Sequence, residues 1–130
     1  MSGVWSWTVP HVYEEKVAGG NWFMYAVEDD TFTGDFLGSG WGDFKIALHI
    51  RKGFMTGDGR TEFTGTVDGK EGTLVIQWAG NTKNDEGWWW FEWIILSGTD
   101  ELANLRGQGT AWGPGPEGVD YSGEIHFAPD

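Results

Sequence analysis

The sequence predicts an all-β fold, a single closed antiparallel β-barrel of about eight strands with little or no helix. Three observations predict it. Large apolar and polar residues alternate along most of the chain, which is the periodicity of a strand. Turn-forming residues separate these stretches at short intervals, as hairpin connections require. Glycine accounts for 22 of the 130 residues, and glycines along one face let a strand bend around a narrow axis.

The predicted strands follow one another along the whole chain. The first covers residues 3–9, with Trp5, Trp7 and Val9 on one face, and Pro10 ends it. Eight more strands are predicted, at 21–28, 31–41, 44–51, 61–67, 72–78, 87–96, 105–112 and 119–127. Turns are predicted at the polar or glycine-rich stretches 28–30, 56–59, 68–72, 81–87 and 113–118. Residues 100–105 favour a helix but are too few for more than a turn.

Glycine positions favour closure of the sheet into a barrel. Gly38 and Gly40 share a face with Phe36, and Gly107 shares a face with Leu105. A strand with one face partly stripped of side chains can coil tightly around a barrel axis. The pattern therefore predicts a lumen partly vacated by glycine, in which a small ligand could lie.

Length and composition narrow the function. A chain of 130 residues is enough for one domain, spanning 1–130, with its own core. The absence of cysteine excludes disulfides, thiolate metal sites and cysteine nucleophiles. The net charge of −12 argues against nucleic acid and anionic membrane surfaces as partners. Since no signal sequence and no apolar run of about 18 residues is found, we expect a soluble, cytoplasmic protein.

One acid interrupts the most apolar stretch of the chain. Residues 88–96 read Trp-Trp-Trp-Phe-Glu-Trp-Ile-Ile-Leu, so we expect both faces of this strand to be covered. Burial would raise the pKa of Glu92, which suits a general acid or base. The structural alternative is an ion pair or hydrogen bond across the sheet, to Arg51, Arg106, Lys45 or Gln77. The pattern leaves open whether Glu92 faces the lumen or a subunit interface.

Tyrosines and histidines supply further candidates. Tyr121 lies on the apolar face of the last strand and Tyr25 lies among apolar residues of the second, so each hydroxyl needs a ligand or a buried partner. The structural alternative for each is a core tyrosine that reaches the barrel rim. His49 and His126 alternate with polar residues and are expected to face solvent, while His11 is expected in a loop. Their spacing predicts no metal site.

Several motifs resemble DUF3224, a bacterial family of unknown function. Residues 97–109, Ser-Gly-Thr-Asp-Glu-Leu-Ala-Asn-Leu-Arg-Gly-Gln-Gly, resemble the family's "SGTGeLagLrGeG" signature. Residues 32–40 resemble "fsGdleGeG", and residues 63–77 resemble "feGtlgGrsGsFvlq". The resemblance implies an allene oxide cyclase-like barrel, in which a preformed apolar cavity holds a reactive or flexible substrate in one geometry. Residues 12–14, Val-Tyr-Glu, are also similar to a segment of allene oxide cyclases whose glutamate takes part in the chemistry, which makes Glu14 a candidate.

The resemblance and the residues together predict a cofactor-free isomerase, cyclase or lyase acting on a small hydrophobic substrate. The candidate catalytic residues are Glu92, Glu14, Tyr121 and Tyr25. The candidate substrate-binding residues are Trp5, Trp7, Phe36, Trp78, Trp90 and Phe127. One alternative is a binding protein for an apolar or aromatic small molecule. Another is a carbohydrate-binding module, against which the embedding of residues 88–93 in an apolar strand argues. Because strands such as 88–96 carry more apolar surface than one interior can absorb, we also expect a homo-oligomer, a dimer or higher.

Overall fold

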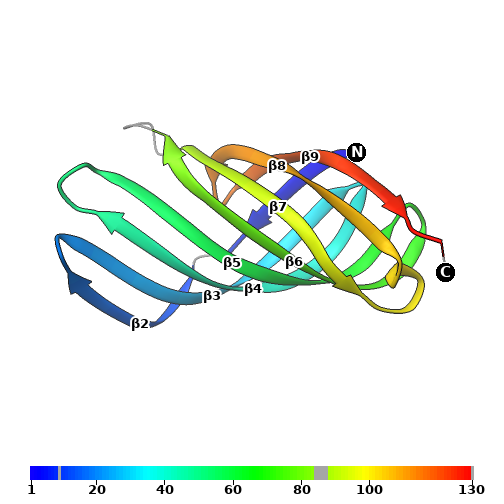
Figure 1. Cartoon of the computed structure of the whole chain (residues 1–130), viewed down its shortest axis with the longest axis horizontal. Coiled ribbons are helices and arrows are strands. Elements are labelled where there is room, and N and C mark those ends of the chain that lie inside the picture. Colours follow the sequence, from blue (N-terminus) through cyan, green and yellow to red (C-terminus); the bar gives the residue numbers. More distant parts are fainter. Residues whose placement is uncertain (9, 84–87, 130) are drawn as a thin grey trace.

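A computed structural model describes residues 1–8, 10–83 and 88–129 (Figure 1). In this part of the chain, nine strands form one antiparallel sheet. They are β1 (Ser2–Trp7), β2 (His11–Ala18), β3 (Asn21–Gly34), β4 (Phe36–His49), β5 (Phe54–Val67), β6 (Lys70–Lys83), β7 (Trp88–Gly98), β8 (Leu105–Gly115) and β9 (Gly118–Phe127). A short 3₁₀ turn, η2 (Asp100–Leu102), precedes β8. None of the described helical residues form a segment long and apolar enough to cross a membrane.

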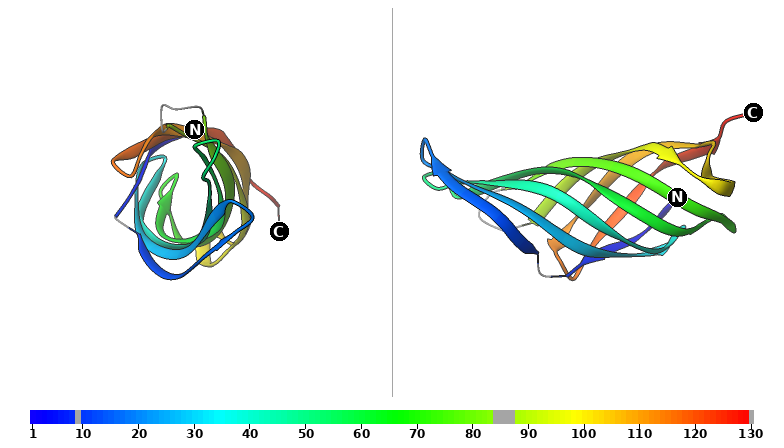
Figure 2. Two further views of the ribbon diagram at one scale, coloured as in Figure 1. Left: turned by 90° about the vertical axis from the view of Figure 1, so that its left-hand side faces the viewer. Right: turned by 90° about the horizontal axis from the view of Figure 1, so that it is seen from below.

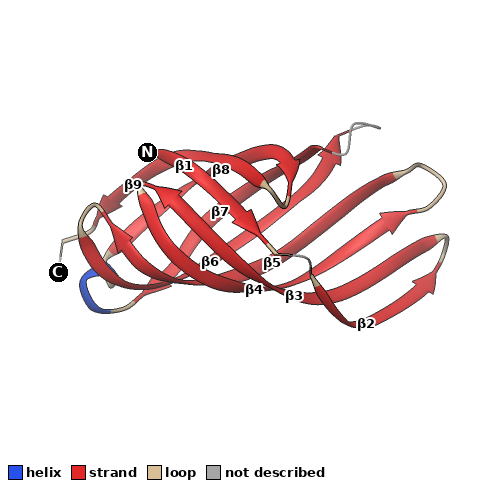
Figure 3. Cartoon of the chain, turned by 180° about the vertical axis from the view of Figure 1, so that it is seen from behind, coloured by secondary structure: helices blue, strands red, loops and turns tan. Residues whose placement is uncertain are grey.

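The sheet closes into a barrel because β1 pairs on one side with β9 and on the other with β3. Eight strands, β1 and β3 to β9, form the closed wall, which Figure 2 shows from its end. The ninth strand, β2, pairs with the part of β3 that β1 leaves free. The hairpins β2–β3 and β4–β5 extend past one end of the barrel (Figure 3). The predicted all-β barrel is therefore confirmed, with one extra strand.

Two predicted turns are wrong. Residues 28–30 lie in the middle of β3, and the chain reverses instead at Asp35, beside Gly34 with a φ of +94°. The predicted strand 31–41 is consequently divided between β3 and β4. Residues 56–59 lie within β5, paired on both edges, and the reversal occurs at 50–53. These acidic and glycine-rich stretches predict turns, but in this barrel they continue as paired strands, with Glu28 and Asp30 facing the lumen and Asp29 and Asp58 exposed.

Two predicted turns, the strand β2 and the exposure of His49 also bear on the sequence expectations. The predicted turn at 68–72 is confirmed in its first residues, since Asp68 and Gly69 have φ of 54° and 75°. Residues 81–83 belong to β6, and the remainder of that predicted turn lies outside the described residues. The expectation of a loop at His11 is wrong, since His11 begins strand β2 and pairs with Val27 of β3. His49 is half-buried rather than solvent-facing, because its ring stacks on Phe54 at 4.1 Å.

The lumen is packed solid toward the end where the C-terminus lies. Phe36 and Phe63 are almost fully buried there, with ring centroids 5.7 Å apart. The glycines of β8 and β9 make room for an indole: a Cβ on Gly109 or Gly123 would lie 2.6 or 2.8 Å from Cζ2 of Trp93. In this half, the space that glycine vacates is filled by Trp93, so the predicted hollow lumen does not exist here. A cavity lies instead in the other half of the barrel.

Candidate functional site

An inner cavity of about 220 Å³ lies at the end of the barrel from which the long hairpins extend. Its wall is formed by Trp5, Trp7, Pro10, Met24, Glu28, Phe44, Ile46, Met55, Trp78, Trp89, Phe91 and Pro116. Eleven of these twelve residues are apolar or aromatic, and Glu28 is the one carboxylic acid. Indole and phenyl rings have few rotamers, so they form a stiff wall around a small apolar space.

Glu28 and Asp30 form a buried carboxyl pair beside this cavity. They alternate on β3, so both side chains point into the barrel, and they are only 7% and 1% exposed. Gly42 of β4 lies opposite Glu28. A Cβ on Gly42 would lie 3.1 Å from Asp30 Oδ2 and 3.2 Å from Glu28 Oε1. The two carboxyl groups thus share the space that this glycine leaves open, and a larger residue there would displace both.

Two further strands hold the pair in position. Thr61 of β5 donates a hydrogen bond from its Oγ1 to Asp30 Oδ2 at 3.0 Å. The indole Nε1 of Trp78, on β6, donates to the same Thr61 oxygen at 3.3 Å. Because Trp78 also lines the cavity, this chain of hydrogen bonds connects the cavity wall to the carboxyl pair. A chain of hydrogen bonds from β5 and β6 thereby holds Asp30 in place on β3.

Burial raises the pKa of both carboxyl groups, and it raises that of Glu28 further than that of Asp30. Burial, the neighbouring charge of Asp30 and hydrogen bonding to Asp30 raise the pKa of Glu28 to about 10. Burial raises the pKa of Asp30 to about 6, opposed by hydrogen bonds from Glu28 and Thr61. At neutral pH the pair therefore holds one proton, with Asp30 ionised and Glu28 neutral. A neutral hydrogen-bond donor beside a carboxylate base is an arrangement suited to acid–base chemistry.

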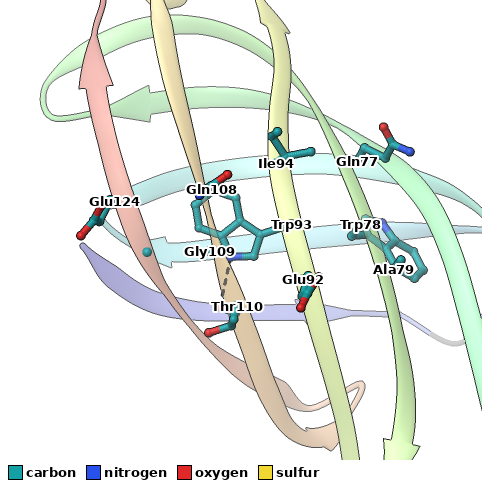
Figure 4. A pocket seen from close by; sticks show the side chains of 11 residues that line it. Gln77, Trp78, Ala79, Glu92, Trp93, Ile94, Gln108, Gly109, Thr110 and Glu124 are labelled. Atoms are coloured by element: carbon teal, nitrogen blue, oxygen red, sulfur yellow. Dashed lines mark hydrogen bonds between the residues drawn. The ribbon is translucent and has the colours of Figure 1, made fainter.

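A larger concavity lies outside the barrel, across β6 to β9 (Figure 4). It has a volume of about 710 Å³ and is an open groove whose rim includes Gln77, Glu92 and Glu124. Glu92 lies on the outer face of the single chain, where it is exposed, and Ile94 beside it is 44% exposed, so coverage of this face by a partner subunit stays a prediction. Alternation explains this exposure, because the residues between them point inward and fill the lumen.

Glu92 also lacks the partner proposed for it. The ion pair found among the described residues is Lys45–Asp58, and no hydrogen bond of the described residues joins Glu92 to Gln77. Since Glu92 points outward, it does not reach the inner cavity. Trp90 of β7 likewise exposes 36% of its surface, and Trp112 of the neighbouring strand β8 exposes 44%, so the tryptophans of β7 are not all embedded.

The other candidate catalytic residues also lie away from the inner cavity. Tyr121 is buried, but its hydroxyl donates to the Thr33 carbonyl at 2.7 Å and accepts from the Phe36 amide at 2.9 Å. This hydroxyl therefore holds the β3–β4 turn against β9. Tyr25 is half-buried and points outward from β3, and Glu14 is exposed on β2.

The family model described as "Protein of unknown function (DUF3224)" matches residues 4–122. The chain belongs to the DUF3224 family. A solved structure of a DUF3224 protein of unknown function from Shewanella oneidensis MR-1 is similar, with a TM-score of 0.82 and 20% sequence identity over 100% of this chain and 97% of that one. At this identity the likeness shows the fold alone, and no curated protein matches.

Within this DUF3224 barrel, the predicted aromatic binding residues separate into two groups. Trp5, Trp7 and Trp78 line the inner cavity, where their role in binding stays a prediction. The others lie elsewhere: Phe36 in the packed half, Trp90 on the outer face and Phe127 under the Lys70 ammonium, 4.0 Å from the ring centroid.

Sequence reasoning missed Glu28 and Asp30 because they flank Asp29 in an acidic run that is typical of turns. A signal was nevertheless present. Residues at every second position from Met24 to Phe32 continue one face, apart from the two acids. In this chain the two acids in phase with an apolar face are buried, and the acid within the wholly apolar strand is exposed.

Proposed function

We propose that this DUF3224 protein is a cofactor-free isomerase that binds a small, largely apolar molecule in the inner cavity and moves a proton on it. The cyclase and lyase reactions predicted from the sequence belong to the same acid–base class. One observation carries the proposal: a buried carboxyl pair that holds one proton at neutral pH meets an aromatic-lined cavity at Glu28.

The cavity volume limits the size of the substrate. An engineered apolar cavity of about 150 Å³ accommodates benzene, so a cavity of about 220 Å³ corresponds to about nine non-hydrogen atoms. A substituted single ring or a short branched chain is of this size. Aromatic faces on several sides would also stabilise positive charge that develops on such a substrate.

The proposed reaction is a proton shift between two carbons. The proton that rests on Glu28 first passes to Asp30. The Glu28 carboxylate then removes a proton from the carbon next to a carbonyl group, and the electron pair moves to the carbonyl oxygen as an enolate. Glu28 then returns its proton to a different carbon, and the double bond moves. The pair ends with the one proton with which it began, so no co-reactant is consumed. The rigid wall holds the substrate in one reactive geometry.

Our proposal includes the relationship to allene oxide cyclases that the sequence motifs predict. An eight-stranded closed barrel and the motif resemblance both support a place in the allene oxide cyclase-like superfamily. In that setting the acid would be supplied by Glu28 rather than by Glu14, which lies on the exposed strand β2.

Conversion of 3-cyclohexen-1-one to 2-cyclohexen-1-one tests the proposal, since this ketone fits the size limit and its product absorbs as a conjugated enone. We expect the protein to accelerate the conversion. Glu28→Gln should lower the rate by at least about 100-fold, because proton transfer by a positioned side chain contributes about 10²–10⁴. The matched control Glu92→Gln alters an outer-face glutamate and should leave the rate unchanged.

A second candidate function is binding without turnover. It is favoured by the wall itself, in which every side chain except that of Glu28 is apolar or aromatic. If small ketones bind in the cavity but none in a panel of β,γ-unsaturated ketones is converted, the isomerase proposal fails and the binding-protein function replaces it.

A further inference from the structure

Half of the residues that line the inner cavity are aromatic. They come from four strands, Trp5 and Trp7 from β1, Phe44 from β4, Trp78 from β6, and Trp89 and Phe91 from β7. Neighbouring rings are nearly perpendicular, with an angle of 72° between Trp5 and Trp78 and of 81° between Trp78 and Phe91. A molecule in the cavity therefore meets ring faces as well as ring edges. The face of an aromatic ring carries partial negative charge and attracts a cation within about 6 Å.

The described wall of this cavity carries no positive charge. The residues that line it include no lysine, arginine or histidine, and Glu28 is their one ionisable side chain. An anionic ligand would lose its hydration there without meeting a counter-charge, which is unfavourable. The net charge of −12 of the chain also attracts cations and repels anions. The wall thus selects against anionic molecules.

The buried carboxyl pair adds a negative charge beside the cavity. Asp30 is ionised at neutral pH although it is only 1% exposed, and Glu28, two residues away on the same strand face, lines the cavity. Hydrogen bonds from Glu28 and Thr61 stabilise Asp30 but do not cancel its charge. Buried charges are usually paired with an opposite charge, yet no lysine, arginine or histidine of the described residues forms an ion pair with either acid. Because Coulomb attraction acts without contact, a cation in the cavity can balance this charge even though Asp30 does not line the wall.

We propose that the ligand of the inner cavity is a small organic cation, a quaternary ammonium or a protonated amine, held among the aromatic rings beside the carboxyl pair. The inference rests on the proposed function, because it names the class of molecule for the same cavity. A volume of about 220 Å³ limits this cation to about nine non-hydrogen atoms. An amino ketone of this size would carry both the cation and the carbonyl group of the proposed reaction.

Isothermal titration calorimetry at pH 7.5 with choline and 3,3-dimethyl-1-butanol tests the inference. The two molecules have the same shape and the same hydroxyl group, and they differ in a positively charged nitrogen in place of a carbon. We expect choline to bind at least about tenfold more tightly. Equal affinities, or binding of neither molecule, would overturn the inference and leave the test of the isomerase with 3-cyclohexen-1-one unaffected. A full preference for choline without conversion of any ketone would support the inference and overturn the isomerase.

Phosphocholine distinguishes a free organic cation from the head group of a lipid, since it carries the same cation joined to a phosphate. We expect phosphocholine to bind more weakly than choline, because no cationic side chain of the wall faces the phosphate. Tighter binding of phosphocholine than of choline would overturn the assignment to a free cation.

The charge of the carboxyl pair should account for most of the preference for choline. The double variant Glu28→Gln with Asp30→Asn removes this charge and keeps the shapes of both side chains, so choline should bind about as weakly as the neutral alcohol. The matched control Glu92→Gln changes an exposed glutamate on the outer face and should keep the full preference. A full preference in the folded double variant would refute the placement of the cation beside the pair.

The pH dependence of the wild type decides the matter if the double variant does not fold. Burial raises the pKa of Asp30 to about 6, so the pair is largely neutral at pH 5, whereas choline keeps its charge at every pH. The charged groups that face the pair are its own members and Asp29, exposed on the same strand. The side chains that face it from neighbouring strands are uncharged, namely Trp7, Gly40, Gly42 and Thr61. We expect the preference for choline over the alcohol to fall at least about threefold from pH 7.5 to pH 5, and an unchanged preference would overturn the inference.

Discussion

Glu28 and Glu92 are the same residue type on two sides of one barrel wall. Each lies in a strand rich in large apolar side chains, yet Glu28 is 7% exposed and Glu92 faces solvent. The neighbours on the same face differ as well. Glu28 has Asp30 two residues away and the open space of Gly42 opposite, whereas Glu92 lies beside the exposed Ile94. Burial of an acid in this fold therefore follows from the face of the strand and not from how apolar the strand is.

The same comparison holds for the aromatic residues of β7. Phe91 and Trp93 point inward and are 3% and 5% exposed, while Trp90 points outward and is 36% exposed. The inward set fills the lumen and forms part of the cavity wall. The outward set covers the outer surface, where it has no role in the cavity. A run of tryptophans thus contributes to two different surfaces at once.

The largest expected difference between the two acids is the pH dependence of stability. The pKa of Glu28 in the folded protein, about 10, lies above its unfolded value, so its protonated form stabilises the fold fully at low pH and this contribution is lost as the pH rises. Asp30 acts in the same direction up to about pH 6. We expect the free energy of unfolding to fall between pH 5 and pH 9 by up to about 1.4 kcal/mol per pH unit for one proton.

Urea unfolding at pH 5, 7 and 9 measures this slope. Glu28→Gln, which cannot ionise, should remove most of it and be more stable than the wild type at pH 9. Glu92→Gln should keep the wild-type slope and change stability by less than about 0.5 kcal/mol at each pH. Equal slopes in the wild type and Glu28→Gln would contradict the buried, protonated state of Glu28.

A smaller effect is expected for the two tyrosines, one on each side of the wall. Tyr121→Phe leaves the Thr33 carbonyl and the Phe36 amide without their partner in a buried site, so it should destabilise the protein by about 1–3 kcal/mol. Tyr25→Phe, on the outward face of β3, should cost less than about 0.5 kcal/mol. The change in stability of each variant is measured from the midpoint of denaturant unfolding. Equal losses of stability in the two variants would show that the hydroxyl of Tyr121 does not hold the β3–β4 turn.

The smallest effect on monomer stability is expected for outer-face apolar residues. Leu37, Trp41 and Leu96 are 56%, 43% and 54% exposed, and we propose that such residues are covered in a homo-oligomer. Size-exclusion chromatography with light scattering should show a multiple of 14.5 kDa. Leu96→Ser should shift the mass toward the monomer and alter monomer stability by less than about 0.5 kcal/mol. A wild-type mass of 14.5 kDa at all concentrations would refute assembly.

The fold was predictable because its signals are local. Alternation defines strands, and glycines such as Gly38 and Gly107 indicate where a sheet can coil. Turn positions were less predictable, since Gly57 and Gly59 lie in a paired strand, and the acids 28–30 that favour a turn face the lumen or solvent within β3. Trp5 and Trp7 of the cavity wall were predictable from the sequence, because alternation places them on the same face of one strand.

The candidate site itself could not be predicted from one strand at a time. Asp30, Thr61 and Trp78 come from β3, β5 and β6, and only strand pairing brings them together. The sequence by itself determined that the chain forms bent, alternating strands that close into a barrel. Only the tertiary structure decided which face of each strand became the lumen, because alternation distinguishes two faces without saying which one closure turns inward. That choice buried Glu28 and left Glu92 in solvent.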